Sequence, residues 1–330
     1  MNKSSLISIL MPVYNAAPWL TECLDSILGQ SQQQWELIAV DDHSTDTSRA
    51  VLMAYAEKDA RIQVHLNKEK GIIPALQLAF AKSSGQWITR MDADDRMAPT
   101  KLADLHSILN DNAPGHLATG FVQYISTTQL GDGYRRYEQW LNNLTIASNN
   151  YQDIYKECVI PSPCWMCHRD DLLRCGAFDS NTYPEDYDLC FRFYKNNLKV
   201  LGVKKVLHFW RDHPHRTSRK SATYADHRYF DLKLPYFLEL DRNDEQPLVL
   251  WGAGKKGKLL AQKLVGLNID FHWVTNNVRK QGLQIYGVEL QTYEIVNSLA
   301  GAQVIVAVAG PEDQEEIKGY LKNRSTYFFC

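Results

Sequence analysis

The chain has 330 residues, a formal net charge of −2 at pH 7, 45% hydrophobic residues and 22% charged residues. These proportions are ordinary for a soluble globular protein, and the length predicts two domains. The near-neutral charge argues against nucleic acid as the main partner. No apolar run approaches the ~20 residues that span a bilayer, so a cytoplasmic location is expected.

Apolar runs alternate with amphipathic stripes through the N-terminal third of the chain. Strands are expected at 6–13, 35–40, 62–66 and 87–91, and helices from the cap Asn15 to Leu28, at 47–57 and at 72–82. This alternation predicts a mainly parallel sheet with helices on both faces. After Pro99 a helix to Leu109 and a strand at 121–125 follow, and the polar, aromatic-rich stretch 131–155 is expected to be irregular.

A polar run at 241–247 interrupts this pattern, and a new α/β unit begins behind it. A strand at 248–251 leads into Gly252-Ala253-Gly254-Lys255-Lys256-Gly257, which matches G-x-G-x-x-G and precedes a helix at 258–265. This is the context of a Rossmann turn. The predicted domains are therefore 1–242 and 243–330.

The expected second strand of this unit, 271–274, ends in Thr275-Asn276-Asn277. A dinucleotide-binding fold usually has an acidic residue there for the ribose hydroxyl, so the sequence argues against NAD binding. The stretch is also too short for a full dehydrogenase domain. We expect a small nucleotide-sensing or packing module.

Cysteine usage indicates reduced thiols, because the seven cysteines are odd in number and scattered along the chain. Cys164-Trp165-Met166-Cys167-His168 superficially matches a haem-attachment pentapeptide and half of a zinc site. No second Cys-x-x-Cys accompanies it, so we interpret the segment as a buried strand.

Two acidic clusters directly follow predicted strands. They are Asp41-Asp42 after strand 35–40, and Asp92-Ala93-Asp94-Asp95 after strand 87–91. Ligands of open α/β sheets bind where strands end, and crowded carboxylates repel one another unless a cation or a donor-rich ligand offsets them. The pair predicts a metal-assisted nucleotide site. The alternative is a set of turn and N-cap aspartates.

Four motifs in chain order carry a family resemblance: Pro12-Val13-Tyr14-Asn15, Val40-Asp41-Asp42-His43-Ser44, Asp92-Ala93-Asp94-Asp95 and Pro184-Glu185-Asp186-Tyr187-Asp188. Over about residues 6–220 the chain resembles the inverting family 2 glycosyltransferases of GT-A fold. The resemblance implies a hexosyl-type transfer from a nucleotide sugar, UDP-linked by first preference, to an acceptor hydroxyl. It further implies a Mn²⁺ or Mg²⁺ cofactor, a glycan or lipid-linked acceptor, and a role in bacterial surface polysaccharide or lipopolysaccharide biosynthesis.

The resemblance also assigns nucleotide contacts. Asp42 would accept a hydrogen bond from the base, Tyr14 would stack on the base, and Pro12 would line the pocket. Lys70 would approach the diphosphate, unless it is an ordinary solvated surface lysine. For Tyr14 and Pro12 the alternative is simple strand-end packing.

The metal ligands implied by the resemblance are Asp94 and Asp95, with Asp94 ranked first. A divalent cation there would act as a Lewis acid on the departing diphosphate. Asp92 or Asp94 would also touch the ribose or the donor sugar, so the sequence leaves the ligating carboxylate open.

A basic segment at 208–219 holds three histidines and three arginines. By resemblance, Arg211 and His213 belong to an element that closes over the diphosphate, where Arg211 can contact phosphate and His213 can ligate the metal. The alternative is a basic surface loop, or a patch that meets anionic lipid headgroups and places the protein at the inner face of the membrane.

Inversion requires a base that takes the proton of the acceptor hydroxyl, and Asp186 is our candidate. Glu185 and Asp188 are the alternatives, and all three could simply form an acidic first turn of a helix. A catalytically idle nucleotide-sugar or dinucleotide sensor is a second hypothesis for the protein. A nucleotidyltransferase is less favoured, because it would want a glycine-rich basic loop where this chain has Tyr14-Asn15-Ala16-Ala17-Pro18.

Overall fold

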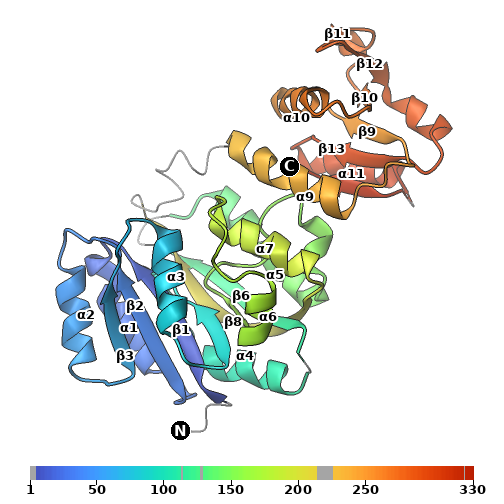
Figure 1. The fold of residues 1–330 in the computed structure, drawn as a ribbon. Helices are drawn as coiled ribbons and strands as arrows, with labels where there is room; N and C mark the ends of the chain where they lie inside the picture. The colour runs from blue at the N-terminus through green and yellow to red at the C-terminus, as the bar shows by residue number, and fades with distance from the viewer. Residues whose placement is uncertain (1–4, 113, 127–128, 214–225, 323) are drawn as a thin grey trace. The chain divides into compact units, whose positions relative to one another are not determined.

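The computed structural model describes residues 5–112, 114–126, 129–213, 226–322 and 324–330. The chain folds into two α/β units (Figure 1). The first unit comprises 1–152 and 159–222, and the second comprises 153–158 and 223–330. The second unit thus begins earlier in the chain than the boundary expected after residue 242.

In the described part of the first unit, eight strands form one sheet in the order β3-β2-β1-β4-β7-β6-β8-β5. Strands β3, β2, β1 and β4 are parallel, β7 runs antiparallel between β4 and β6, and β5 runs antiparallel to β8. The strands are β1 (Ile7–Val13), β2 (Trp35–Asp41), β3 (Ile62–Leu66), β4 (Trp87–Arg90), β5 (Arg96–Met97), β6 (His116–Ile125), β7 (Trp165–His168) and β8 (Lys199–Arg211).

Helices pack on this sheet through alternate residues of its strands. Ile7, Ile9 and Met11 of β1 share one buried core with α1 and α4, while α3 packs against β1 and β2. Each fully buried aliphatic side chain stabilises such a core by roughly 1.5–3 kcal/mol. The helices are α1 (Ala17–Leu28), α2 (Ser48–Ala56), α3 (Ile72–Lys82), α4 (Lys101–Asn110), α5 (Asp132–Ala147), η2 (Asn150–Asp153), α6 (Arg169–Arg174) and α7 (Glu185–Lys195).

Helix α5 corrects the expectation of an irregular stretch at 131–155. Its buried face carries Leu141 and Leu144, and its aromatic residues pack against the same core. Asn142 joins the helix to β6, because its side-chain amide accepts from the backbone N–H of Val122 at 3.0 Å and donates to the carbonyl of Val122 at 2.9 Å. Asn142 therefore satisfies backbone groups of β6 beyond the residues that pair with β7, and does not mark a loop.

The start of α1 also differs from the expectation. Ala16 is the N-cap residue and makes no side-chain cap bond, while the carboxylate of Asp46 accepts from the backbone N–H of Ala17 at 3.1 Å. Asn15 has a φ of 48° and accepts a hydrogen bond from the backbone N–H of Thr45 at 2.8 Å. Asn tolerates this left-handed conformation better than most residues, so Asn15 forms the turn before the helix instead of capping it.

All seven cysteines are free thiols, as predicted, and six of them are buried. Cys164 directly precedes β7 and Cys167 lies within it, and both are buried. This confirms the interpretation of that segment as a buried strand. Cys330 alone is partly exposed.

The second unit has its own six-stranded sheet among the described residues, in the order β11-β12-β10-β9-β13-β14. All neighbouring strands except β11 and β12 are parallel. Its elements are α9 (Asp226–Leu240), β9 (Leu248–Trp251), α10 (Lys255–Gly266), β10 (His272–Thr275), η4 (Val278–Lys280), β11 (Gln284–Ile285), β12 (Val288–Thr292), η5 (Tyr293–Ser298), β13 (Gln303–Val306), α11 (Pro311–Tyr320) and β14 (Thr326–Phe328). None of the helices in the described ranges is long and apolar enough to cross a membrane.

Candidate active site

The sheet order of the first unit brings the sequence motifs together at one edge. Strands β2, β1 and β4 are parallel neighbours, with Val13 opposite Asp41 and Leu10 opposite Arg90. Their carboxyl ends therefore lead into Tyr14, Asp42 and Asp92 on the same side of the sheet. This edge is where ligands bind in open α/β sheets.

Asp42 anchors the loop that carries Lys70. Its carboxylate is 7% exposed, and it accepts from the side-chain amide of Asn67 at 2.7 Å and from the backbone N–H of Gly71 at 2.9 Å. The ammonium of Lys70 lies 3.4 Å from the hydroxyl of Tyr14 and 4.7 Å from the centre of its ring. The structure thus places Asp42, Tyr14 and Lys70 at one corner, where Tyr14 is 48% exposed.

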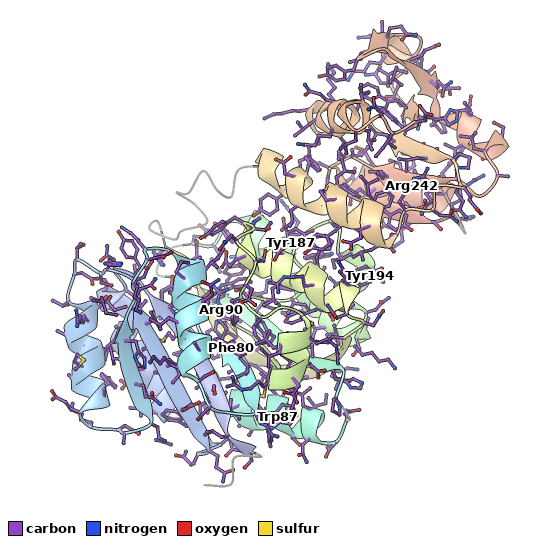
Figure 2. The ribbon with its side chains drawn as sticks, viewed as in Figure 1. Phe80, Trp87, Arg90, Tyr187, Tyr194 and Arg242 are labelled. Carbon is purple, nitrogen blue, oxygen red and sulfur yellow. The ribbon has the colours of Figure 1, made fainter. Side chains whose placement is uncertain are left out.

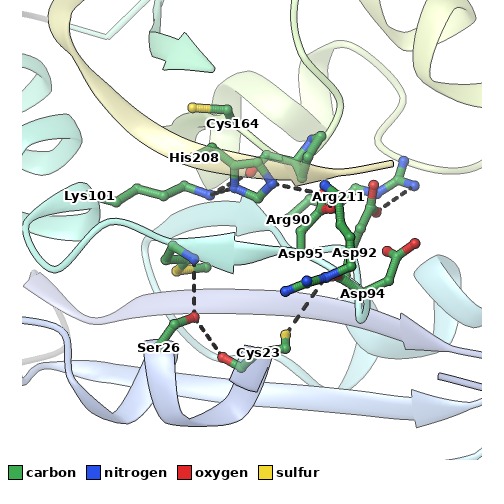
Figure 3. A network of polar contacts seen from close by, with 12 residues as sticks. Cys23, Ser26, Arg90, Asp92, Asp94, Asp95, Lys101, Cys164, His208 and Arg211 are labelled. Atoms are coloured by element: carbon green, nitrogen blue, oxygen red, sulfur yellow. Dashed lines mark hydrogen bonds and ion pairs between the residues drawn. The ribbon is translucent and has the colours of Figure 1, made fainter. Parts of the chain in front are cut away.

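A buried chain of three polar side chains holds the second acidic cluster (Figure 3). The ammonium of Lys101 lies 3.1 Å from Nδ1 of His208, and Nε2 of His208 lies 2.8 Å from Oδ2 of Asp95. All three residues are at most 1% exposed. Because an ammonium group only donates, Nδ1 accepts and Nε2 carries the proton that is donated to Asp95.

Asp95 is therefore an internal anchor of the loop. Its other oxygen, Oδ1, accepts the backbone N–H of Arg211 at 2.7 Å. Both oxygens are engaged in a buried setting, and this geometry disfavours Asp95 as a metal ligand.

Asp94 is placed differently, since its side chain is 25% exposed. Its Oδ2 lies 2.8 Å from Nε2 of His213, whose ring stacks on Trp19 with centroids 3.8 Å apart. A carboxylate oxygen and an imidazole nitrogen are donors that Mn²⁺ accepts. In the described ranges no group of three or more metal-binding side chains is found, so a cation at this pair would take its remaining ligands from the substrate and water.

Arg211 clamps the loop from the other side. Its Nε donates to the carbonyl of Asp94 at 2.8 Å, and its guanidinium pairs with Glu22 at 2.5 Å. In this structure the guanidinium is thus held by protein groups, which differs from the phosphate contact expected for it. The rest of the basic segment, 214–219, lies outside the described residues.

Arg90 is a site residue that the sequence analysis missed. It lies in the interior of the first unit, with 5% of its side chain exposed (Figures 2 and 3). Its guanidinium contacts Asp92 and Glu185, each at 3.2 Å. The sequence contains one indication of this role, which is that Arg90 lies near the end of the apolar run Trp87–Met91. An arginine buried in such a strand requires anionic partners.

The three carboxyl groups of Pro184-Glu185-Asp186-Tyr187-Asp188 have different environments. Glu185 is paired with Arg90, and Asp188 is buried and paired with Arg192 at 2.8 Å. Burial, reinforced by the charge of Glu185, raises the pKa of Asp186 to about 7, while Arg90 opposes this shift. A carboxyl group whose pKa lies near neutrality suits proton transfer.

The buried Lys101 gives a test of the anchor. In Lys101→Met the volume is nearly preserved, but the Asp95 and His208 pair loses its cation. We expect a loss of about 3–5 kcal/mol in the free energy of unfolding, because an uncompensated buried charge is costly. Urea unfolding measures it.

Lys205→Met is the matched control for that experiment, because Lys205 pairs with Asp104 and 62% of its side chain is exposed. It is expected to change stability by less than about 1 kcal/mol. Equal stability of the two variants would show that Lys101 does not support the loop.

Comparison with known proteins places the chain in a family. A model described as glycosyl transferase family 2 matches residues 8–176, just over half of the chain. The chain belongs to glycosyl transferase family 2. The glycosyltransferase GlyG of Streptococcus pneumoniae serotype 4 is 36% identical over 218 residues, which cover 63% of this chain and 71% of GlyG.

Other glycosyltransferase relatives match over part of their length. TuaG of Bacillus subtilis, whose name assigns it provisionally to teichuronic acid biosynthesis, is 32% identical over 51% of this chain and 64% of TuaG. The chain spans only 28% of an uncharacterized glycosyltransferase of Rickettsia bellii and 30% of GlyA of Streptococcus pneumoniae.

Solved structures confirm the predicted GT-A fold. S. aureus TarS 1–349 in complex with UDP-GlcNAc superposes with a TM-score of 0.55 at 16% identity, covering 72% of this chain and 68% of TarS 1–349. The mannosyltransferase PcManGT of Pyrobaculum calidifontis, in complex with GDP-Man and Mn²⁺, gives a TM-score of 0.52 at 19% identity, over 79% of this chain and 70% of PcManGT.

Proposed function

We propose that this protein is a metal-dependent, inverting glycosyltransferase of hexosyl type, which moves a sugar from a nucleotide-sugar donor to an acceptor hydroxyl. The observation that carries the proposal is Arg90, which joins the Asp92 loop to the turn bearing Asp186. One buried cation thus ties a carboxylate cluster suited to a nucleotide diphosphate to a carboxyl group suited to proton transfer. The donors in TarS and PcManGT, UDP-GlcNAc and GDP-Man, support a nucleotide sugar, and a UDP-sugar is the first candidate.

On the donor side, Asp42 and Tyr14 would hold the nucleobase beside Pro12, and Lys70 would approach the diphosphate. Asp94 and His213 would hold Mn²⁺ or Mg²⁺, which supplies Lewis-acid stabilisation of the departing diphosphate. Asp92, held by Arg90, would accept hydrogen bonds from the ribose or the donor sugar.

On the acceptor side, Asp186 would take the proton of the attacking hydroxyl. Its pKa of about 7 keeps half of the population deprotonated at neutral pH. Glu185 would act on Asp186 by charge, since its own carboxylate is held by Arg90.

The acceptor we propose is a glycan or lipid-linked glycan in the assembly of a bacterial surface polysaccharide or lipopolysaccharide. The name of TuaG supports this role, because it refers to teichuronic acid biosynthesis.

A donor screen tests the proposal. The full-length protein is incubated with UDP-, GDP- and dTDP-sugars and Mn²⁺, and release of the nucleoside diphosphate is followed with and without EDTA. We expect release from one nucleotide class that EDTA suppresses, and an anomeric configuration in the product opposite to that of the donor by NMR. Absence of release and of donor binding across the panel would overturn the proposal.

Arg90→Gln should move the pH dependence of activity. Because Arg90 lowers the pKa of Asp186, its removal raises that pKa, and the rise of kcat/KM with pH should shift to higher pH. The control is Arg96→Gln, which removes an exposed guanidinium paired with Glu22. A profile that falls in amplitude without moving would mean that Arg90 acts on folding alone.

A further inference from the structure

The second unit contains a cavity of about 580 Å³ that the proposed transfer reaction does not use. It lies where β9, β10 and β13 end, and it is lined by the glycine turn that joins β9 to α10. Strand β9 has β10 on one side and β13 on the other, so the strand order reverses there. Ligands of parallel α/β sheets bind at such a point, in pockets of roughly 300–1,000 Å³.

At the glycines of this turn the cavity wall is formed by backbone without side chains. Gly252 has a φ of 122°, and a Cβ on Gly257 would lie 2.0 Å from the carbonyl oxygen of Gly252, so both glycines are required by the fold. Gly254 differs, because a Cβ there would have no atom within 4 Å. Its missing side chain therefore leaves open space for a ligand in front of the first turn of α10.

Hydrogen-bond donors dominate the polar lining. Asn276 accepts from the indole N–H of Trp251 at 2.6 Å, and Asn277 accepts from the backbone N–H of Arg279 at 3.0 Å. These bonds occupy the two amide oxygens and leave the NH₂ groups to donate. Lys280 extends the same side of the lining, with its ammonium 2.8 Å from the carbonyl of Ala253.

The charge of the lining is positive. Lys255, Lys256 and Lys280 line the cavity, against the single carboxylate of Asp313. Phosphate groups are ligands that ammonium groups and the N–H groups of a helix start bind together. A ribose hydroxyl pair that requires a carboxylate acceptor at the end of β10 is disfavoured, since that end offers amide donors.

We propose that this cavity binds a phosphorylated nucleotide. Its phosphates lie against Gly254, Lys255 and Lys256, with Lys280 beside the same turn, and an acceptor-rich group of the ligand lies against Asn277. Such a ligand has two sources, a nucleoside diphosphate with or without its sugar, or a dinucleotide that bears an additional phosphate.

Calorimetry of the full-length chain with UDP, UDP-GlcNAc, NADP⁺ and NAD⁺ tests the proposal. EDTA is present throughout, so that binding which needs a divalent cation does not contribute. We expect one ligand class to saturate the protein at one site, with NADP⁺ bound more tightly than NAD⁺ if the source is a dinucleotide. Saturation by UDP or UDP-GlcNAc would identify the other source.

Gly254→Asp is the decisive variant, because its side chain enters open space and places a carboxylate where the phosphates lie. It should weaken binding by about tenfold or more. Gly266→Asp, at the far end of α10 and also with nothing within 4 Å, is the matched control and should change Kd by less than about twofold. Lys256→Glu repeats the test should Gly254→Asp lose its native circular dichroism.

Two outcomes would overturn the proposal. One is that no member of the panel saturates the protein at millimolar concentration. The other is that a ligand binds the native chain and both cavity variants equally, which would place it elsewhere and leave the transferase proposal untouched.

Discussion

Asp186→Asn is expected to lower kcat by a factor on the order of 10²–10⁴, the usual contribution of a general base. The amide preserves the shape of the side chain but cannot take a proton. The donor KM should change little, because Asp186 is assigned to the acceptor side. Initial rates of nucleoside diphosphate release at saturating acceptor measure the effect.

The pH profile supplies a second, independent readout for Asp186. With a pKa of about 7, the base is protonated below neutrality, so kcat/KM of the native enzyme should fall about tenfold per pH unit below pH 7 and level off above it. The contribution of Asp186 to thermal stability should fall as pH rises, whereas kcat/KM increases. Burial disfavours the ionised carboxyl, so its contribution to stability is lost as pH rises through 7, and Asp186→Asn should unfold at a higher temperature than the native chain at pH 8.

Two variants, Asp170→Asn in α6 and Asp188→Asn in the first turn of α7, separate catalysis from structure. Asp170→Asn changes an aspartate with 82% of its side chain exposed, and should leave both rate and stability unchanged. Asp188→Asn breaks the pair with Arg192 and should lower stability without shifting the pH midpoint. If Asp188→Asn instead abolished the pH dependence, the base would be Asp188.

Asp94→Ala is expected to lower kcat/KM by about 10³, since metal assistance is worth several kcal/mol and about 4 kcal/mol corresponds to that factor. Calorimetry in the presence of UDP should show loss of Mn²⁺ binding. The thermal midpoint should be nearly unchanged, because the side chain is partly exposed.

For the comparison variant Asp95→Asn we expect the opposite effect on stability. Its buried carboxylate is bonded to His208 and to the backbone of Arg211, so this variant should lower the thermal midpoint. If Asp95→Asn lost Mn²⁺ while remaining fully stable, Asp95 would be the ligand and the assignment to Asp94 would be wrong.

Regular elements of this fold are predictable wherever local pattern and tertiary packing agree. Strand β9 occupies the expected residues 248–251, because a polar run and a glycine turn border a short apolar segment. Helix α5 was not predictable in the same way. Its apolar face is largely aromatic and its polar face contains Asn142, whose partner Val122 lies in β6, outside the helix itself.

The residues of the candidate site also differ in whether a local sequence pattern predicts them. Tyr14 and Asp42 could be found because they directly follow β1 and β2, and Asp94 because it lies in the short acidic loop after β4, all at the strand ends where ligands bind. The anchoring of Asp95 could not, since His208 is 113 residues away in the chain and Lys101 reaches it only through that histidine. Partners at such separations are set by the sheet order, which no local pattern encodes.

Because six of the seven cysteines are buried, the native chain offers one cysteine for selective chemical labelling. Burial raises the pKa of Cys23, Cys164 and Cys167, so few of these thiols are reactive thiolates at neutral pH. A maleimide dye should therefore modify Cys330 first, one per chain, with no cysteine replaced. The carbonyl of Cys330 accepts from Gln314 of α11, so the dye would report on the second unit alone.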